Sequence, residues 1–132
     1  MNNQVKNSKY YKMGFAFFAF CLWGGWSFYV NAQSSGLKVG LVSGLVQGFC
    51  SFIITLFIGF LIEKQFNFYQ KIWLKLILPP IITILISGSC LVFIHLCIAT
   101  PHIVKTISPA ITVAFIFACL TNIKLYRQQK ID

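Results

Sequence analysis

The sequence predicts an all-α, polytopic integral membrane protein with four transmembrane helices and both ends of the chain in the cytoplasm. Of its 132 residues, 58% are hydrophobic and only 10% are charged, and the mean hydropathy is +0.78. A soluble domain of this length cannot bury so much apolar surface, so the chain belongs in a membrane. Long apolar runs alternate with short polar segments, and the basic residues gather in every second segment, which predicts the orientation.

Four apolar runs define the predicted spans, which together form a single transmembrane domain. The spans are about 13–30, 37–62, 80–99 and 106–123. A cleaved signal peptide is an alternative for the first run, but its length and the bulky Trp26 and Tyr29 near its end favour a retained span. Residues 63–78 mix aromatic side chains with lysines, which predicts an interfacial segment between the second and third spans.

Prolines are expected to mark the beginnings of the third and fourth spans. Proline fits the first turn of a helix but disrupts its interior, so the third span is expected to start or kink at Pro79 and Pro80. In the fourth span, Ser108 is a candidate N-cap before Pro109. If Pro109 merely kinks the helix, the fourth helix begins near Ile103.

The basic residues define the predicted orientation. Nine of the eleven Lys and Arg residues lie before the first span, between the second and third spans, or after the fourth, and only Lys38 and Lys105 lie at the opposite ends. Short cytoplasmic loops are enriched in Lys and Arg, so both termini are placed in the cytoplasm. The short basic clusters are expected to contact anionic lipid headgroups, and they lack the continuous basic surface that nucleic-acid binding needs.

Small residues recur every four positions on two of the predicted spans. The second span carries Gly36, Gly40, Gly44 and Gly48, and the fourth carries Ala110, Ala114 and Ala118. Such a face lets two helix backbones approach closely inside lipid. We therefore expect a glycine zipper on the second helix and close contact between the second and fourth helices, within one chain, in a homo-oligomer or with another membrane protein. The two series are similar either because the chain contains two duplicated helical hairpins, formed by spans one and two and by spans three and four, or because the spacing arose by chance.

The spans lack the groups that membrane enzymes use. The only acidic residues are Glu63 and Asp132, and no Asp, Glu or Arg lies inside a predicted span. The histidines His95 and His102 have no third metal ligand nearby in the sequence, and the five cysteines form no C-x-x-C pair. The sequence therefore predicts no catalytic residue, no metal site and no cofactor.

Several polar and aromatic side chains lie in the half of the spans opposite the basic clusters. They are Trp26, Tyr29, Asn31, Gln47 and His95. One interpretation is a shallow outward-facing pocket that holds a lipid or isoprenoid chain. The alternative is structural: Gln47 hydrogen-bonds a neighbouring helix, His95 satisfies a backbone carbonyl, and the aromatic residues form an interfacial belt.

Two functions remain open from the sequence. The first is a non-catalytic accessory or assembly subunit of the inner (plasma) membrane, which presents the glycine-rich face of the second helix to a second copy or to another membrane protein. The alternative is a small oligomeric transporter or flippase for a hydrophobic or lipid-linked substrate. The sequence does not identify the substrate, the partner or the oligomeric state.

Overall fold

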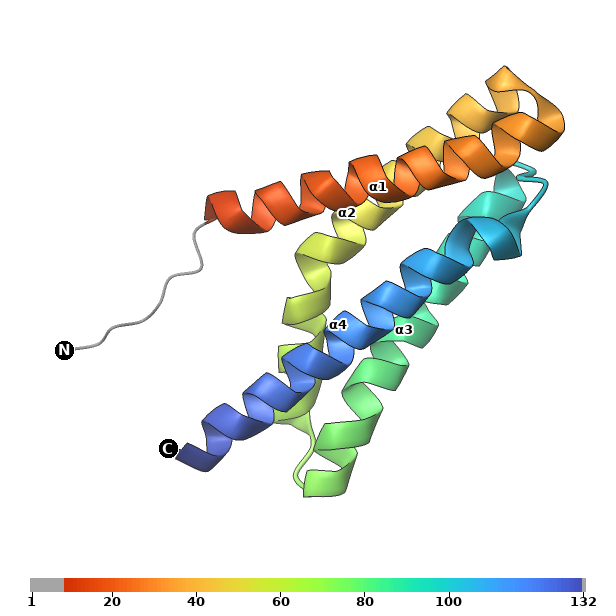
Figure 1. Ribbon diagram of the computed structural model, residues 1–132. Helices are drawn as coiled ribbons and strands as arrows, with labels where there is room; N and C mark the ends of the chain where they lie inside the picture. The colour runs from red at the N-terminus through yellow and green to blue at the C-terminus, as the bar shows by residue number, and fades with distance from the viewer. Residues whose placement is uncertain (1–8, 132) are drawn as a thin grey trace.

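The computed structural model describes residues 9–131, which form four α-helices joined by short turns (Figure 1). They are α1 (Lys9–Ser35), α2 (Leu37–Phe68), α3 (Ile72–Cys97) and α4 (Ile103–Ile131). Each helix is long and apolar enough to cross a membrane. The prediction of an all-α protein with four candidate membrane-spanning helices is therefore confirmed.

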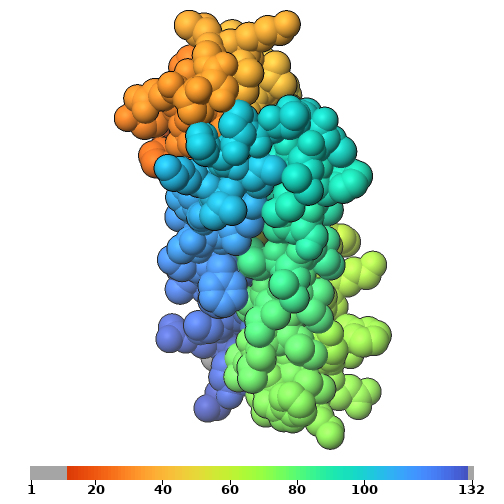
Figure 2. All heavy atoms as spheres, turned by 90° about the vertical axis from the view of Figure 1, so that its right-hand side faces the viewer, coloured from red at the N-terminus to blue at the C-terminus, as the bar shows by residue number. Residues whose placement is uncertain are grey.

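The helices form a chain of antiparallel neighbours. Figure 1 shows α1 running beside the first half of α2, after which α2 continues beside α3 and α4. The first part of α1 diverges from the other three helices, and the backbones of α1 and α3 do not approach one another within residues 9–131. In Figure 2, α3 and α4 lie side by side on one face, and the turn between α1 and α2 projects beyond the turn between α3 and α4.

Residues 63–78 are helical except at residues 69–71, because α2 continues to Phe68 and α3 begins at Ile72. The interfacial position of this segment stays a prediction. Phe66 is buried, so the last turns of α2 pack against the bundle instead of leaving it. Aromatic residues alternating with lysines suit an amphipathic continuation of a long helix as well as a surface segment.

Pro79 and Pro80 both lie inside α3 and both are buried, so the helix does not start at them, and of the two predicted alternatives only a kink is compatible with their position. A proline lacks the N–H group that would bond the carbonyl four residues earlier, so these two prolines free the carbonyls of Lys75 and Leu76. Asn122 of α4 donates from Nδ2 to both carbonyl oxygens at 2.9 Å. The side chain of another helix thus supplies the donors that the prolines lack, and α3 continues through them.

Pro109 follows the same arrangement inside α4, which begins at Ile103 as the kinked alternative predicted. The carbonyl four residues before Pro109 belongs to Lys105. Trp26 of α1 donates from Nε1 to that oxygen at 2.9 Å. Each carbonyl that a proline frees in this bundle therefore receives a hydrogen bond from a side chain of a different helix.

The glycine-rich face of α2 packs against α1, whereas the sequence favoured α4. A Cβ atom added at Gly44 would lie 2.9 Å from the carbonyl oxygen of Gly24, and one added at Gly24 would lie 2.9 Å from the carbonyl oxygen of Gly44. The two backbones therefore touch at these glycines, where no larger residue fits. Gly48 packs against Phe20 in the same interface.

The two ends of the predicted glycine series behave differently. Gly40 is buried against Ala32 of α1, whereas Gly36 lies outside the packing face. Gly36 is the residue between α1 and α2, it is exposed, and its φ of 89° lies in the left-handed region that favours glycine. The assignment of Gly36 to helix packing is therefore corrected to a turn residue.

The alanine series of α4 faces the interior of the bundle. Ala118 is fully buried and packs with Ile58 and Ile62 of α2 in the apolar core. Ala110 is also buried, and Ala114 is partly buried beside the same core. These small residues let α4 lie close to α2 and α3.

Candidate functional site: polar clusters at one end of the bundle

The five side chains predicted to line a pocket separate into two groups in the structure. Asn31, Gln47 and His95 are completely buried between helices. Trp26 and Tyr29 are exposed on α1 and line an open cavity. The five residues therefore lie at the same end of the bundle but do not form one pocket.

Gln47, His95 and Thr100 form a buried chain of hydrogen bonds between α2 and the end of α3. His95 Nε2 lies 2.7 Å from Gln47 Oε1, and His95 Nδ1 lies 2.8 Å from Thr100 Oγ1. An amide oxygen only accepts hydrogen bonds, so Nε2 carries the proton and donates, while Nδ1 accepts from the threonine hydroxyl. Gln47 Nε2 extends the chain by donating to Ser51 Oγ at 3.3 Å.

The backbone after α3 positions Thr100 over His95. Ala99 adopts a φ of 52°, in the left-handed region, and the Thr100 N–H donates to the His95 carbonyl oxygen at 3.0 Å. This is the geometry of a helix C-terminus that is closed by a left-handed residue, where glycine is the usual choice. The reversal of the chain brings the Thr100 hydroxyl back to the imidazole.

Asn31 joins α1 to the beginning of α4. Its Nδ2 donates to Thr106 Oγ1 at 2.9 Å and to the Ser27 carbonyl at 2.8 Å, and its Oδ1 accepts from the His102 N–H at 3.3 Å. Thr106 Oγ1 in turn donates to the His102 carbonyl at 2.7 Å. Both the Nδ2 and the Oδ1 atom of the Asn31 amide are therefore used in contacts within the protein.

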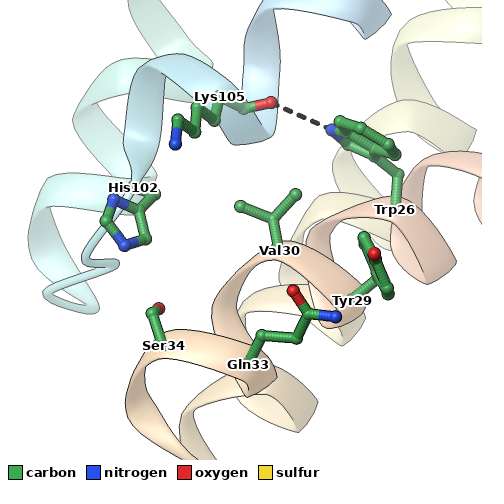
Figure 3. Close-up of a pocket in the computed structure, with 7 residues that line it drawn as sticks. All are labelled: Trp26, Tyr29, Val30, Gln33, Ser34, His102 and Lys105. Carbon is green, nitrogen blue, oxygen red and sulfur yellow. Dashed lines mark hydrogen bonds between the residues drawn. The ribbon is translucent and has the colours of Figure 1, made fainter.

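An open cavity of about 540 Å³ lies beside this junction (Figure 3). Helix α1 contributes four lining residues and the indole of Trp26, which closes one end. The four residues are Tyr29, Val30, Gln33 and Ser34. The opposite side is lined by His102, just before α4, and by Lys105 in the first turn of α4. Its lining combines two aromatic side chains, two basic side chains and two uncharged polar ones, without an acidic residue. We call this space the outer cavity, because the orientation predicted from the basic residues places this end of the helices outside the cytoplasm.

The lining of the outer cavity suits an amphiphile better than a chemical reaction. Lys105 and His102 supply cationic or donor groups, while Trp26 and Tyr29 offer apolar rings with a polar edge. Glu63 is exposed next to Lys64 near the opposite end of α2, away from this cavity. Within residues 9–131, no three His, Cys, Asp or Glu side chains lie together in a way that would hold a metal ion.

Comparison of the chain with known protein families, with curated proteins and with solved structures finds no match. The geometry of the four-helix bundle and its outer cavity therefore carries the functional argument.

The Trp26 hydrogen bond gives a testable prediction. Trp26→Phe removes the donor to the Lys105 carbonyl and keeps an aromatic ring, so we expect the free energy of unfolding in detergent to fall by about 1 kcal/mol. In a Pro109→Ala background, the restored N–H group bonds that carbonyl and the effect of Trp26→Phe should largely vanish. Trp73→Phe, at an exposed position on α3, is the matched control. An equal loss from Trp26→Phe in both backgrounds would contradict this role of the indole.

Proposed function

We propose that the protein is a small, non-catalytic transporter or flippase subunit that binds a lipid or lipid-linked substrate with an anionic head in the outer cavity. The observation that carries the proposal is the lining of that cavity, which combines the basic residues Lys105 and His102 with the aromatic residues Trp26 and Tyr29. These residues belong to the last turns of α1 and the region that begins α4, which is the depth of lipid headgroups if the helices span the bilayer. A head with negative charge would lie near Lys105, and its chain would follow the exposed apolar side chains of α1 into the lipid.

The second candidate is an accessory subunit. The packing of α2 means that such a subunit cannot use the glycine-rich face of α2 to bind its partner. Gly40, Gly44 and Gly48 contact α1 of the same chain, so a partner has no access to this face while the hairpin is intact. A partner would have to contact the lipid-facing surface instead, for example α1 around Phe17 and Phe18, which are exposed where α1 diverges from the bundle. This surface offers apolar contact without a specific recognition group, so we place the substrate-binding function first.

We further propose that the protein resides in the inner (plasma) membrane with both ends in the cytoplasm. Nine of the eleven basic residues support this orientation. A reporter enzyme that is active only in the cytoplasm should be active when fused after residue 132 and inactive when inserted after Ser35. The opposite pattern would place the outer cavity on the cytoplasmic side and overturn the orientation.

Native mass spectrometry of the protein extracted from its own membrane tests the substrate-binding function. We expect a discrete anionic lipid or lipid-linked species to remain bound to the native chain. Lys105→Gln should weaken its retention roughly fivefold, because a lysine near an anionic surface contributes about 1 kcal/mol. Lys38→Gln, an exposed lysine at the same end that does not line the cavity, is the control.

Equal retention by the two lysine variants, or no bound amphiphile, would overturn the proposed site. A fluorescent short-chain phosphatidylglycerol in vesicles containing the purified protein then tests transport separately from binding. Binding without movement of this probe, together with co-purification of a second protein, would favour the accessory subunit.

A further inference from the structure

A second, smaller cavity lies between the helices and is lined by side chains of all four. Its volume is about 40 Å³, and it shares no lining residue with the outer cavity. Its wall includes Trp23 of α1, Ser51 and Thr55 of α2, Ser87 of α3, and Ala110 and Ala114 of α4. The small side chains of the α4 alanine series leave this space open.

Three residues with hydroxyl groups line this second cavity, which we call the inner cavity, and each has unused hydrogen-bonding capacity. Ser87 Oγ makes no hydrogen bond to any residue that the structure describes, and Ser87 is 9% exposed. Ser51 Oγ accepts from Gln47 Nε2, but its own proton has no acceptor among residues 9–131. Thr55 Oγ1 donates to the Ser51 carbonyl at 2.7 Å and keeps its lone pairs free. An unpaired hydroxyl in a protein interior is costly, so a small polar ligand would be stabilised here.

We propose that the inner cavity binds ordered water between Ser51, Thr55 and Ser87. A site needs roughly 10–15 Å³ of such space for one water molecule, so a cavity of about 40 Å³ has room for at least one and for about three or four at most. A water molecule here accepts from the hydroxyls of Ser51 and Ser87 and donates to Thr55 Oγ1, which gives it about the three partners that buried waters usually have. The cavity differs in this respect from purely apolar cavities, which stay dry.

The water site has a structural consequence for the contact between α2 and α3. Two direct hydrogen bonds join these helices, one from His95 to Gln47 and one from Gln65 to Thr83 at 2.8 Å. The inner cavity lies between them along the bundle, where no direct hydrogen bond joins α2 to α3 within the described residues. The bound water supplies the missing link and extends the polar chain of Thr100, His95, Gln47 and Ser51 into the centre of the bundle.

Water-edited solid-state NMR of the full chain in lipid bilayers tests this site directly. We expect magnetisation to pass from water to the side chains of Ser51, Thr55 and Ser87. Ser43 is the control, because it is a buried serine whose hydroxyl already donates to the carbonyls of Val39 and Gly40 at 2.9 and 3.2 Å. Ser43 should receive no comparable signal, although it lies near the beginning of α2 and therefore closer to bulk water than the inner cavity does.

A variant that fills the inner cavity shows whether the NMR signal comes from water bound there or from another source. Ala114→Leu should abolish the water signal at Ser51 and Ser87, whereas Val113→Leu, at an exposed neighbouring position, should leave it unchanged. Absence of the signal at Ser87 in the unmodified chain, or transfer from lipid chains instead of water, would overturn the proposal. An unchanged signal in folded Ala114→Leu would do the same. If that variant does not fold, the comparison of Ser87 with Ser43 decides the question.

Discussion

Gly44→Leu is expected to separate α1 from α2 and to lower the free energy of unfolding by about 3 kcal/mol, the upper end for overpacked interiors. A Cβ atom at this position meets the Gly24 carbonyl oxygen and the Phe28 Cβ atom, both at 2.9 Å. The first of these is backbone, so the clash is relieved only if the two helices move apart. Val42→Leu adds similar bulk at a position of α2 that is 43% exposed, and it should leave stability unchanged.

Reversible unfolding of the two variants in detergent micelles, followed at several protein concentrations, measures this difference. The contact between Gly24 and Gly44 lies within one chain, so the loss caused by Gly44→Leu should not depend on protein concentration. A loss that grows on dilution would mean that the glycine face of α2 mainly joins separate chains. Equal stability of Gly44→Leu and Val42→Leu would contradict the close packing itself.

The sequence shows which face of α2 needs close packing but not which helix packs against it. Gly40, Gly44 and Gly48 are recognisable because small residues recur at helical spacing in an apolar run. The partner Gly24 lies between Trp23 and Gly25 in a span rich in aromatic residues, where no repeating series marks it. The alanine series of α4 offered a stronger pattern, but it faces α2 and α3 in the bundle interior.

The positions of the prolines within α3 also depend on residues far away in the sequence. Proline inside a helix costs about 3 kcal/mol, which favours placing Pro79 and Pro80 at a helix start. The structure keeps them inside because Asn122, far along the chain, donates to the two freed carbonyls. The positions of these carbonyls follow from the sequence, but the identity of a distant donor depends on the tertiary arrangement. The same holds for Trp26, for which the sequence suggests either a pocket or an aromatic belt and not a hydrogen bond to the Lys105 carbonyl.

The sequence predicts which polar and aromatic residues lie at this end of the bundle, but it does not predict how they are arranged. Gln47 and His95 were recognised as polar groups within apolar spans, but their 2.7 Å hydrogen bond removes both from the open cavity. Thr100 and Thr106 are not predicted as site residues, since threonines near helix ends carry no signal that links them to His95 or Asn31. Lys105 and His102 were assigned to a connection between spans, and only the antiparallel arrangement of α1 and α4 brings them beside Trp26 and Tyr29.

Asn122→Leu is expected to destabilise the protein by about 3 kcal/mol, more than a typical contact between membrane helices. Interhelical hydrogen bonds in membrane proteins contribute about 0.6 kcal/mol on average, because lost partners are often replaced. Here one side chain serves two carbonyls, and no proline N–H group can replace it, so each oxygen is left unpaired at about 1–3 kcal/mol. Asn122 is itself 1% exposed, and its Oδ1 has no partner among the described residues, so its role in this contact is that of a donor.

A double-mutant cycle with the prolines isolates this role. In a Pro79→Ala, Pro80→Ala background, the restored N–H groups can bond the carbonyls of Lys75 and Leu76, so Asn122→Leu should lose most of its effect. Asn67→Leu, at an exposed position near the end of α2, controls for replacing an asparagine by leucine. The loss measured for Asn122→Leu should therefore be large in the native chain and small in the proline-free chain. The same loss in both backgrounds would show that Asn122 stabilises α4 through packing, and that α3 tolerates its prolines for another reason.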